Sequence, residues 1–261
     1  MLSKRAVWNI EFRKLLHRKD MWIMLTMFGI PALYSIGVFL NSSAIVFNGH
    51  DKEYAMGFFL NMFFFVDSIF IYFFILSLIA SRSLGGEIEN KSILLYTQRI
   101  NNRRRIYQAK VWSLITMVSL ICIAFFFVTM LMFYIFAVQR EDIISSQFIK
   151  KEEIVGLMLF FLSIVFIYIF TINISIMLST LFKTNTAVII FSIVFILFIF
   201  ISKFPGIRYI SLQYYTEQLS TIDLSNTSKV VTLFFANLGI FLIYSFICNF
   251  IGIKRFERRD L

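Results

Sequence analysis

Residues 111–138 read VWSLITMVSLICIAFFFVTMLMFYIFAV, a run without a single charged side chain. A helix of about 20 apolar residues is long enough to cross the hydrocarbon core of a bilayer, because each residue adds about 1.5 Å. The run therefore predicts a helix that spans a membrane, with residues to spare at either end.

Five further apolar runs lie along the chain, at residues 21–40, 55–80, 154–182, 187–202 and 230–253. Of the 261 residues, 59% are hydrophobic and only 15% are charged, whereas a soluble domain has about a quarter of its residues charged. The connections between the runs are too short to hold a second folded domain. We therefore expect an all-α membrane protein with about six transmembrane helices, forming one domain over residues 1–261 without a soluble catalytic part.

Two segments outside the spans have patterns of their own. Residues 1–20 mix apolar side chains with six Lys and Arg residues at helical spacing, which predicts an interfacial amphipathic helix on the inner leaflet. A simple basic topology signal is the alternative, and we find no cleavage site typical of a signal peptide. The fifth run is short and continues through Lys203-Phe204-Pro205-Gly206, which predicts a broken, re-entrant extracellular segment over residues 203–229.

The distribution of basic residues predicts the orientation. If both termini are cytoplasmic, the inner segments hold 18 of the 25 Lys and Arg residues and the outer segments hold seven. This is the bias expected of a multi-pass protein of the inner (cytoplasmic) membrane. The net charge of +10 then faces anionic lipid headgroups, and it gives no reason to expect a nucleic acid as partner.

Residues that could carry out catalysis are sparse. The two histidines, His17 and His50, fall on opposite sides of the predicted membrane, and Cys122 and Cys248 lie inside apolar runs. No group of ligands has the spacing of a metal site, and the segment 85–92 lacks the second glycine of a phosphate-binding loop. We therefore expect no catalytic residue, no metal and no directly bound cofactor.

Asp67 is the one acidic residue near the middle of an apolar run. A carboxylate at that depth is costly and usually faces a cavity or a partner, so one interpretation is a substrate path or a contact within a dimer. The other is a structural hydrogen bond to Ser68, Asn61, Thr171 or Asn173. Asn61 and Asn173 themselves are expected to link neighbouring helices.

The longest inner segment, residues 81–110, contains the most informative pattern. Gly85-Gly86 is expected to end the helix that leaves the second span. Residues 87–96 then follow as a short amphipathic helix, with Glu87 and Glu89 in its first turn, where the helix dipole favours acids. A short helix held at the membrane surface between two spans is suited to docking a cytosolic partner.

The order of residues in this segment resembles that of ABC-2 type exporter permeases. In that family, an interfacial helix precedes six spans, and the loop after the second span carries a coupling helix. The pattern is carried here by Glu89, Ser92, Leu94-Leu95, Arg103 and Lys110, and by the tail Phe256-Glu-Arg-Arg-Asp260. The resemblance implies that contact with the ATPase is made by Gly86, Glu87, Glu89, Ser92, Leu94, Leu95 and Arg103.

The resemblance implies a function as well as a fold. Such a permease moves a hydrophobic or amphipathic substrate, such as a peptide, toxin, antibiotic or lipid-like molecule, out of the cell. A separate cytosolic ABC ATPase binds the ATP and Mg²⁺, and a second copy or a sister permease completes the pore among the membrane lipids. The sequence leaves two alternatives open, a membrane-embedded lipid-modifying enzyme and a non-transporting scaffold or sensor domain.

Overall fold

The computed structural model describes residues 4–42, 52–100 and 102–259, so that His50, Asp260 and the first three residues of the predicted interfacial helix lie outside it. Its α-helices are α1 (Lys4–Leu16), α2 (Lys19–Met24), α3 (Gly29–Phe39), α4 (Ala55–Ser68), α5 (Ile71–Glu89), α6 (Ile93–Arg99), α7 (Arg103–Ile135), α8 (Ile154–Leu181), α9 (Thr184–Lys203), α10 (Leu212–Thr221) and α11 (Thr227–Arg258). Short 3-10 helices are η1 (Leu25–Phe28), η2 (Ala137–Gln139), η3 (Lys151–Glu153) and η4 (Arg208–Ile210).

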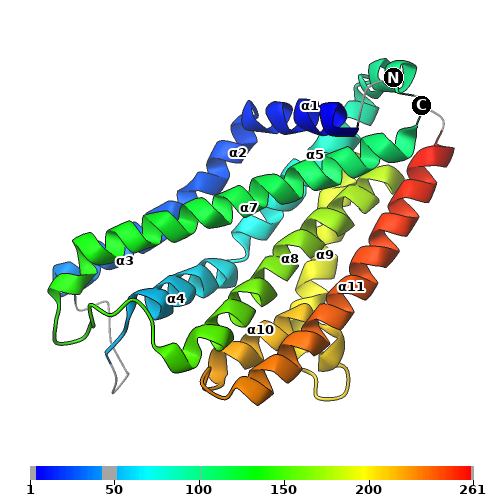
Figure 1. The fold of residues 1–261 in the computed structure, drawn as a ribbon. Helices are drawn as coiled ribbons and strands as arrows, with labels where there is room; N and C mark the ends of the chain where they lie inside the picture. Colours follow the sequence, from blue (N-terminus) through cyan, green and yellow to red (C-terminus); the bar gives the residue numbers. More distant parts are fainter. Residues whose placement is uncertain (1–3, 43–51, 101, 260–261) are drawn as a thin grey trace.

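Six helical segments within the described residues are long and apolar enough to cross a membrane. They are Lys19–Phe39, Ile71–Glu89, Arg103–Gln139, Lys151–Leu181, Thr184–Lys203 and Thr227–Arg258. The prediction of an all-α, multi-pass membrane protein is confirmed. Helices α1 and α6 and the last turn of α11 lie at one end of the bundle, called here the terminal end, and α10 lies at the opposite, far end (Figure 1).

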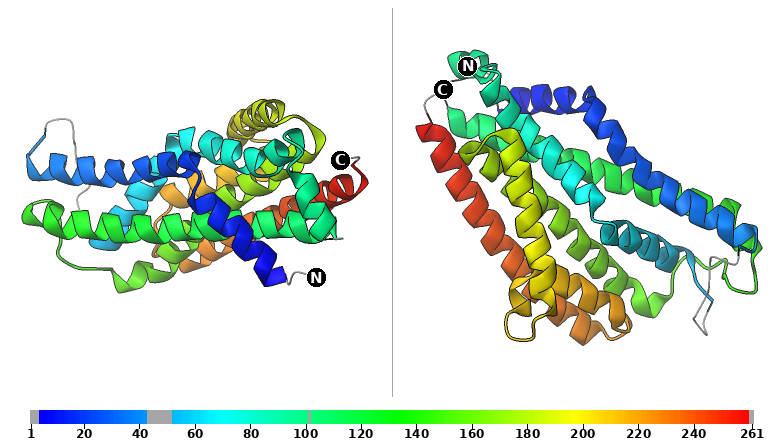
Figure 2. Two further views of the ribbon diagram at one scale, coloured as in Figure 1. Left: turned by 90° about the horizontal axis from the view of Figure 1, so that it is seen from above. Right: turned by 180° about the vertical axis from the view of Figure 1, so that it is seen from behind.

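Helix α8 is the centre of the bundle. It packs against α5, α7, α9 and α11, and Figure 1 shows it between α7 and α11, while Figure 2 shows α5 and α9 on its other side. Small polar residues of α8 are buried at these contacts, among them Ser163, Ser175 and Ser179. Small side chains allow helix backbones to approach closely in a membrane, and the hydroxyl of Ser175 donates to the hydroxyl of Ser77 on α5 at 2.8 Å.

The first span is not one continuous α-helix, and Pro31 lies in the first turn of its last segment, α3. Proline has no N–H to donate to the carbonyl four residues earlier, which here belongs to Met27 in the 3-10 helix η1. The span therefore consists of α2, η1 and α3 in succession, and it packs along α7.

The second apolar run differs from the continuous helix predicted over residues 55–80. It contains two helices, α4 and α5, separated at Phe70, whose backbone is left-handed with φ of 59°. A non-glycine residue in that conformation is held there only by its surroundings, and the Phe70 ring packs edge-on against Phe195 of α9 at 5.9 Å. The segment that meets the length criterion for a span is Ile71–Glu89.

The prediction that Gly85 and Gly86 end the helix of the second span is wrong, because α5 continues through both to Glu89. A Cβ atom at Gly85 would lie 2.9 Å from the Thr184 hydroxyl and 3.2 Å from the Ser179 Cβ. The glycine thus allows α5 to pack closely against the turn between α8 and α9.

The predicted helix over residues 87–96 is likewise divided. Helix α5 ends at Glu89, Lys91 adopts a left-handed backbone with φ of 57°, and α6 begins at Ile93.

The segment between the fifth and sixth spans folds back at the far end. It contains η4 and α10, and α10 packs against α8, α9 and α11. Its buried residues include polar ones, such as Gln213 and Thr216.

Candidate functional site

Four charged side chains from three helices meet at the terminal end of the bundle. The Lys110 ammonium group of α7 is 1% exposed and donates to Glu11 Oε2 of α1 at 2.7 Å and to the Ser83 carbonyl of α5 at 2.7 Å. It also lies 2.8 Å from Glu87 Oε2 of α5. The Lys14 ammonium group of α1 donates to Glu87 Oε1 at 2.8 Å and lies 3.5 Å from Glu11 Oε1. We call Glu11, Lys14, Glu87 and Lys110 the ionic cluster.

The ionic cluster fixes α1 against α5 and α7. The buried side of α1 is the stripe Val7, Glu11 and Leu15, spaced by four residues so that the three lie on one face. Sequence reasoning missed Glu11. The one available signal was a lone acid at the centre of that stripe, with a lysine at the start of the third span as a candidate partner.

Three residues of the family-like pattern hold helix ends together. The Glu89 carboxylate accepts from the backbone N–H of Thr184, the first residue of α9, where the helix dipole favours negative charge. The Arg103 guanidinium donates to the carbonyls of Glu257 at 3.1 Å and Arg259 at 2.6 Å, at the end of α11. The Arg259 guanidinium donates in turn to the Thr180 carbonyl at 2.9 Å, at the end of α8.

These contacts change what the predicted docking residues offer to a partner. The carboxylates of Glu87 and Glu89 are engaged within the chain. The Ser92 hydroxyl donates to the Glu87 carbonyl at 3.3 Å. In α6, Ile93 is fully buried, Leu94 is half-buried and Leu95 is 65% exposed. Among the α6 side chains that the structure describes, Leu95 is therefore the apolar one that a partner can reach.

An open hollow of about 580 Å³ lies beside the ionic cluster. Its lining includes Arg18, Arg82, Gly86, Glu89 and Asn90, so that the predicted docking segment forms one of its walls. There is free space beside Gly86 in this wall, since a Cβ atom there would meet only Arg82 Cβ, at 4.0 Å.

The two predicted asparagines serve different contacts. Asn173 of α8 is 2% exposed and donates to the Ser245 hydroxyl of α11 at 3.2 Å, while its own side-chain oxygen accepts from Asn249 at 3.1 Å. Asn173 thus links α8 to α11. Asn61 instead lies exposed near the far end and donates to Glu53 Oε1 at 2.6 Å.

Asp67 lies at the break in the second span, one residue before the end of α4. It is 6% exposed, and its Oδ1 has no hydrogen-bond partner among the described residues. The four partners considered for it bond elsewhere: Ser68 to the Phe64 carbonyl, Asn61 to Glu53, Thr171 to the Ile167 carbonyl, and Asn173 to α11. A carboxylate at the C-terminal end of a helix is also opposed by the helix dipole, so this position brings α4 no electrostatic gain.

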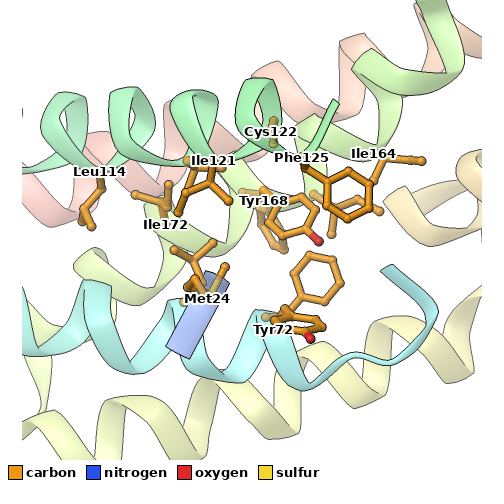
Figure 3. Close-up of a cluster of buried hydrophobic side chains, with 14 of the residues drawn as sticks. Met24, Tyr72, Leu114, Ile121, Cys122, Phe125, Ile164, Tyr168 and Ile172 are labelled. Carbon is orange, nitrogen blue, oxygen red and sulfur yellow. The ribbon is translucent and has the colours of Figure 1, made fainter. Parts of the chain in front are cut away.

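The surroundings of Asp67 are aromatic. Tyr168 of α8 interacts electrostatically with Asp67, and its buried hydroxyl has no partner among the described residues. Figure 3 shows the Tyr168 ring among Ile121, Cys122 and Phe125 of α7, with Tyr72 of α5 below it. Two polar groups for which the described residues provide no hydrogen-bond partner therefore lie in the apolar interior next to the helix break.

A second hollow, of about 700 Å³, opens at the far end between α4, α8 and α10. Its lining includes charged residues, Lys52, Glu53, Lys150 and Glu153, as well as apolar ones such as Phe64, Phe65, Leu157 and Phe160. Burial raises the pKa of Glu53, and the hydrogen bond from Asn61 acts in the opposite direction. A hollow lined by both charged and apolar side chains suits a molecule that is itself amphipathic.

The described residues include no group of three or more His, Cys, Asp or Glu side chains that could hold a metal ion. No protein-family model matches the chain, and a search of curated proteins finds no match.

Proposed function

We propose that the chain is the membrane-spanning permease subunit of an ATP-driven exporter, similar to the ABC-2 type. A cytosolic ATPase binds the ATP and Mg²⁺, docks on the terminal end, and drives a pair of permeases between two states. The second permease is another copy of this chain or a sister subunit. The observation that carries the proposal is α6, a short helix at the terminal end that follows α5 and presents the exposed side chain of Leu95.

The contacts that α5 makes with neighbouring helices support a coupling role for α6. Helix α6 follows α5 after a tight turn, and α5 is joined to α1 and α7 through Glu87 and to α9 through Glu89. A push on α6 is therefore passed along the chain to α5 and from there, through charged contacts, to three further helices, α1, α7 and α9. Such linked, discrete contacts are what a rigid-body transition between two states requires.

The proposed orientation places both termini in the cytoplasm and the chain in the inner membrane. Its support is the excess of Lys and Arg in the segments of the terminal end, 18 of 25. The proposed substrate is hydrophobic or amphipathic, and its support is the far-end hollow, which is lined by both charged and apolar side chains.

Purification of the tagged chain from the cells that produce it tests the proposal. The wild-type chain is expected to bring an ATP-hydrolysing subunit with it in fixed proportion. Burying an exposed Leu side chain contributes up to about 1.5–3 kcal/mol, so Leu95→Lys is expected to release that subunit. The control is Leu16→Lys, which alters a Leu of α1 that is 44% exposed at the same end.

The outcomes separate two parts of the proposal. A wild-type chain that purifies from intact membranes without any ATP-hydrolysing subunit contradicts the exporter function. A subunit that stays bound to the Leu95→Lys chain, with hydrolysis unchanged, contradicts only the docking role of α6.

A further inference from the structure

A groove lies between α1 and the start of α7, on the terminal end and apart from the ionic cluster. Figure 2 shows α1 crossing α7 obliquely, and the groove beside this crossing has a volume of about 460 Å³. Its lining includes Lys4, Arg5 and Trp8 of α1, and Arg105 and Trp112 of α7.

The groove concentrates positive charge without compensation. Lys4, Arg5 and Arg105 form no ion pair with any described carboxylate. Neither α1 nor α7 has an acidic residue in its first turn, although the positive end of a helix dipole favours one there. Three like charges at two helix N-termini repel one another, and a bound anion in the groove would remove that repulsion.

The groove continues into an apolar stripe on the surface of α7. Trp112 is 60% exposed, and beyond it along the helix Leu120, Ile123 and Phe127 are 46%, 52% and 64% exposed. Together with Thr116, these positions are spaced by three or four residues and so lie on one face. At about 1.5 Å per residue, the stripe extends roughly 20 Å, enough for an acyl chain that reaches the middle of a bilayer.

We propose that the groove binds the phosphate of an anionic phospholipid, with one acyl chain along the α7 stripe. Lys4, Arg5 and Arg105 hold the phosphate. Trp8 and Trp112 lie at the level of the headgroups, where tryptophan is enriched in membrane proteins. The apolar stripe favours a lipid over a soluble phosphate compound, which would leave that surface uncovered. The inference does not depend on the transport function proposed above.

Quenching of tryptophan fluorescence by brominated lipids tests the proposal. The chain has three, and Trp22, the one outside the groove, is replaced in a Trp22→Phe background. The protein is reconstituted in vesicles of phosphatidylcholine that contain brominated phosphatidylglycerol or brominated phosphatidylcholine, whose acyl bromines quench tryptophan on contact. The ratio of the two quenching constants measures the preference for the anionic lipid. Because each basic residue near a membrane surface contributes severalfold in affinity, we expect a preference of about tenfold or more.

Two triple variants test the residues. The change Lys4→Gln, Arg5→Gln and Arg105→Gln is expected to bring the preference close to one. The control, Lys91→Gln, Lys183→Gln and Arg258→Gln, removes the same charge from exposed positions at the same end, outside the groove, and should retain it. Equal loss in both variants would contradict a specific site and indicate general surface attraction. If the groove triple variant does not fold, the wild-type ratio still decides, since a value near one contradicts the proposal.

A competition experiment identifies the source of the phosphate. Inorganic phosphate added at matched ionic strength is expected to leave the quenching by brominated phosphatidylglycerol unchanged. Full displacement by inorganic phosphate would overturn the lipid assignment and identify the groove as a site for a soluble phosphate.

Discussion

Replacing Lys110 with Met is expected to cost a large share of the stability of the fold. The Lys110 ammonium group is 1% exposed and contacts Glu11, Glu87 and the Ser83 carbonyl within 2.8 Å. Met keeps the length of the side chain but leaves a buried Glu11 carboxylate whose remaining cation, Lys14, lies 3.5 Å away. Removing one member of a buried ion pair costs about 3–5 kcal/mol. Since Lys14 still compensates Glu87, we expect a loss near the lower limit, about 3 kcal/mol.

The measurement is the free energy of unfolding in mixed detergent micelles, followed by circular dichroism while a denaturing detergent is added. A double variant, Glu11→Leu with Lys110→Met, serves as the control because it removes the unpaired carboxylate as well as the lysine. Replacing a buried ion pair by apolar side chains is often close to neutral, so the double variant should be more stable than Lys110→Met alone by at least about 1 kcal/mol. A loss below about 1 kcal/mol in Lys110→Met, or a double variant less stable than the single one, would refute the reasoning.

Three further predictions follow from the packing, the helix break and the charge distribution. Gly252→Ala should destabilise the fold because its Cβ would overlap the Tyr107 ring of α7, whereas Gly239→Ala on the same helix has open space around it and should be neutral or stabilising by up to about 1 kcal/mol; thermal unfolding compares the two. Asp67→Asn, which keeps the shape of the side chain beside Tyr168 but removes the ionisable carboxyl group, should leave unfolding unchanged and lower substrate export, and unaltered export would favour a purely structural role. Reporter fusions at the two termini should both give cytoplasmic signals, and an outside signal at either end would contradict the proposed orientation.

The spans could be predicted from sequence because their signal is local. A long apolar run needs no knowledge of its neighbours to be identified as a membrane helix. The break at Phe70 could not be predicted in this way, since the residues around it, Ser68-Ile69-Phe70-Ile71, include neither glycine nor proline. The left-handed Phe70 lies against α9, and its contact with Phe195 joins positions that are far apart in the sequence.

At Gly85-Gly86, by contrast, the sequence predicts a helix end that the structure does not have. Gly85-Gly86 has the composition of a helix end, yet α5 passes through it because Gly85 is where α5 approaches Thr184 and Ser179. From one sequence, a glycine that ends a helix cannot be distinguished from a glycine that allows two helices to approach closely.

The candidate site was predicted in outline only. The segment around Glu87 and Glu89 is the one that joins several helices, but its carboxylates bond to Lys14, Lys110 and the start of α9. These pairs are separated by 23 positions (Glu87 and Lys110) to 95 positions (Glu89 and Thr184), so they depend on the folded arrangement, and local spacing gives no information about them. Leu95 is exposed for contact with a partner while Leu94 is half-buried, and this difference could be known only from the orientation of α6.

Cross-linking from residue 95 in intact membranes tests the central claim most directly. The chain has two cysteines, Cys122 and Cys248, both buried, and serine at these positions provides a background for Leu95→Cys with a short thiol-reactive photo-cross-linker. We expect one major adduct, with a subunit that binds and hydrolyses ATP, and no such adduct from Leu40→Cys, which is 68% exposed after α3. An adduct from residue 95 that contains only a second copy of the chain or only lipid, or an ATPase adduct from residue 40, would contradict the claim.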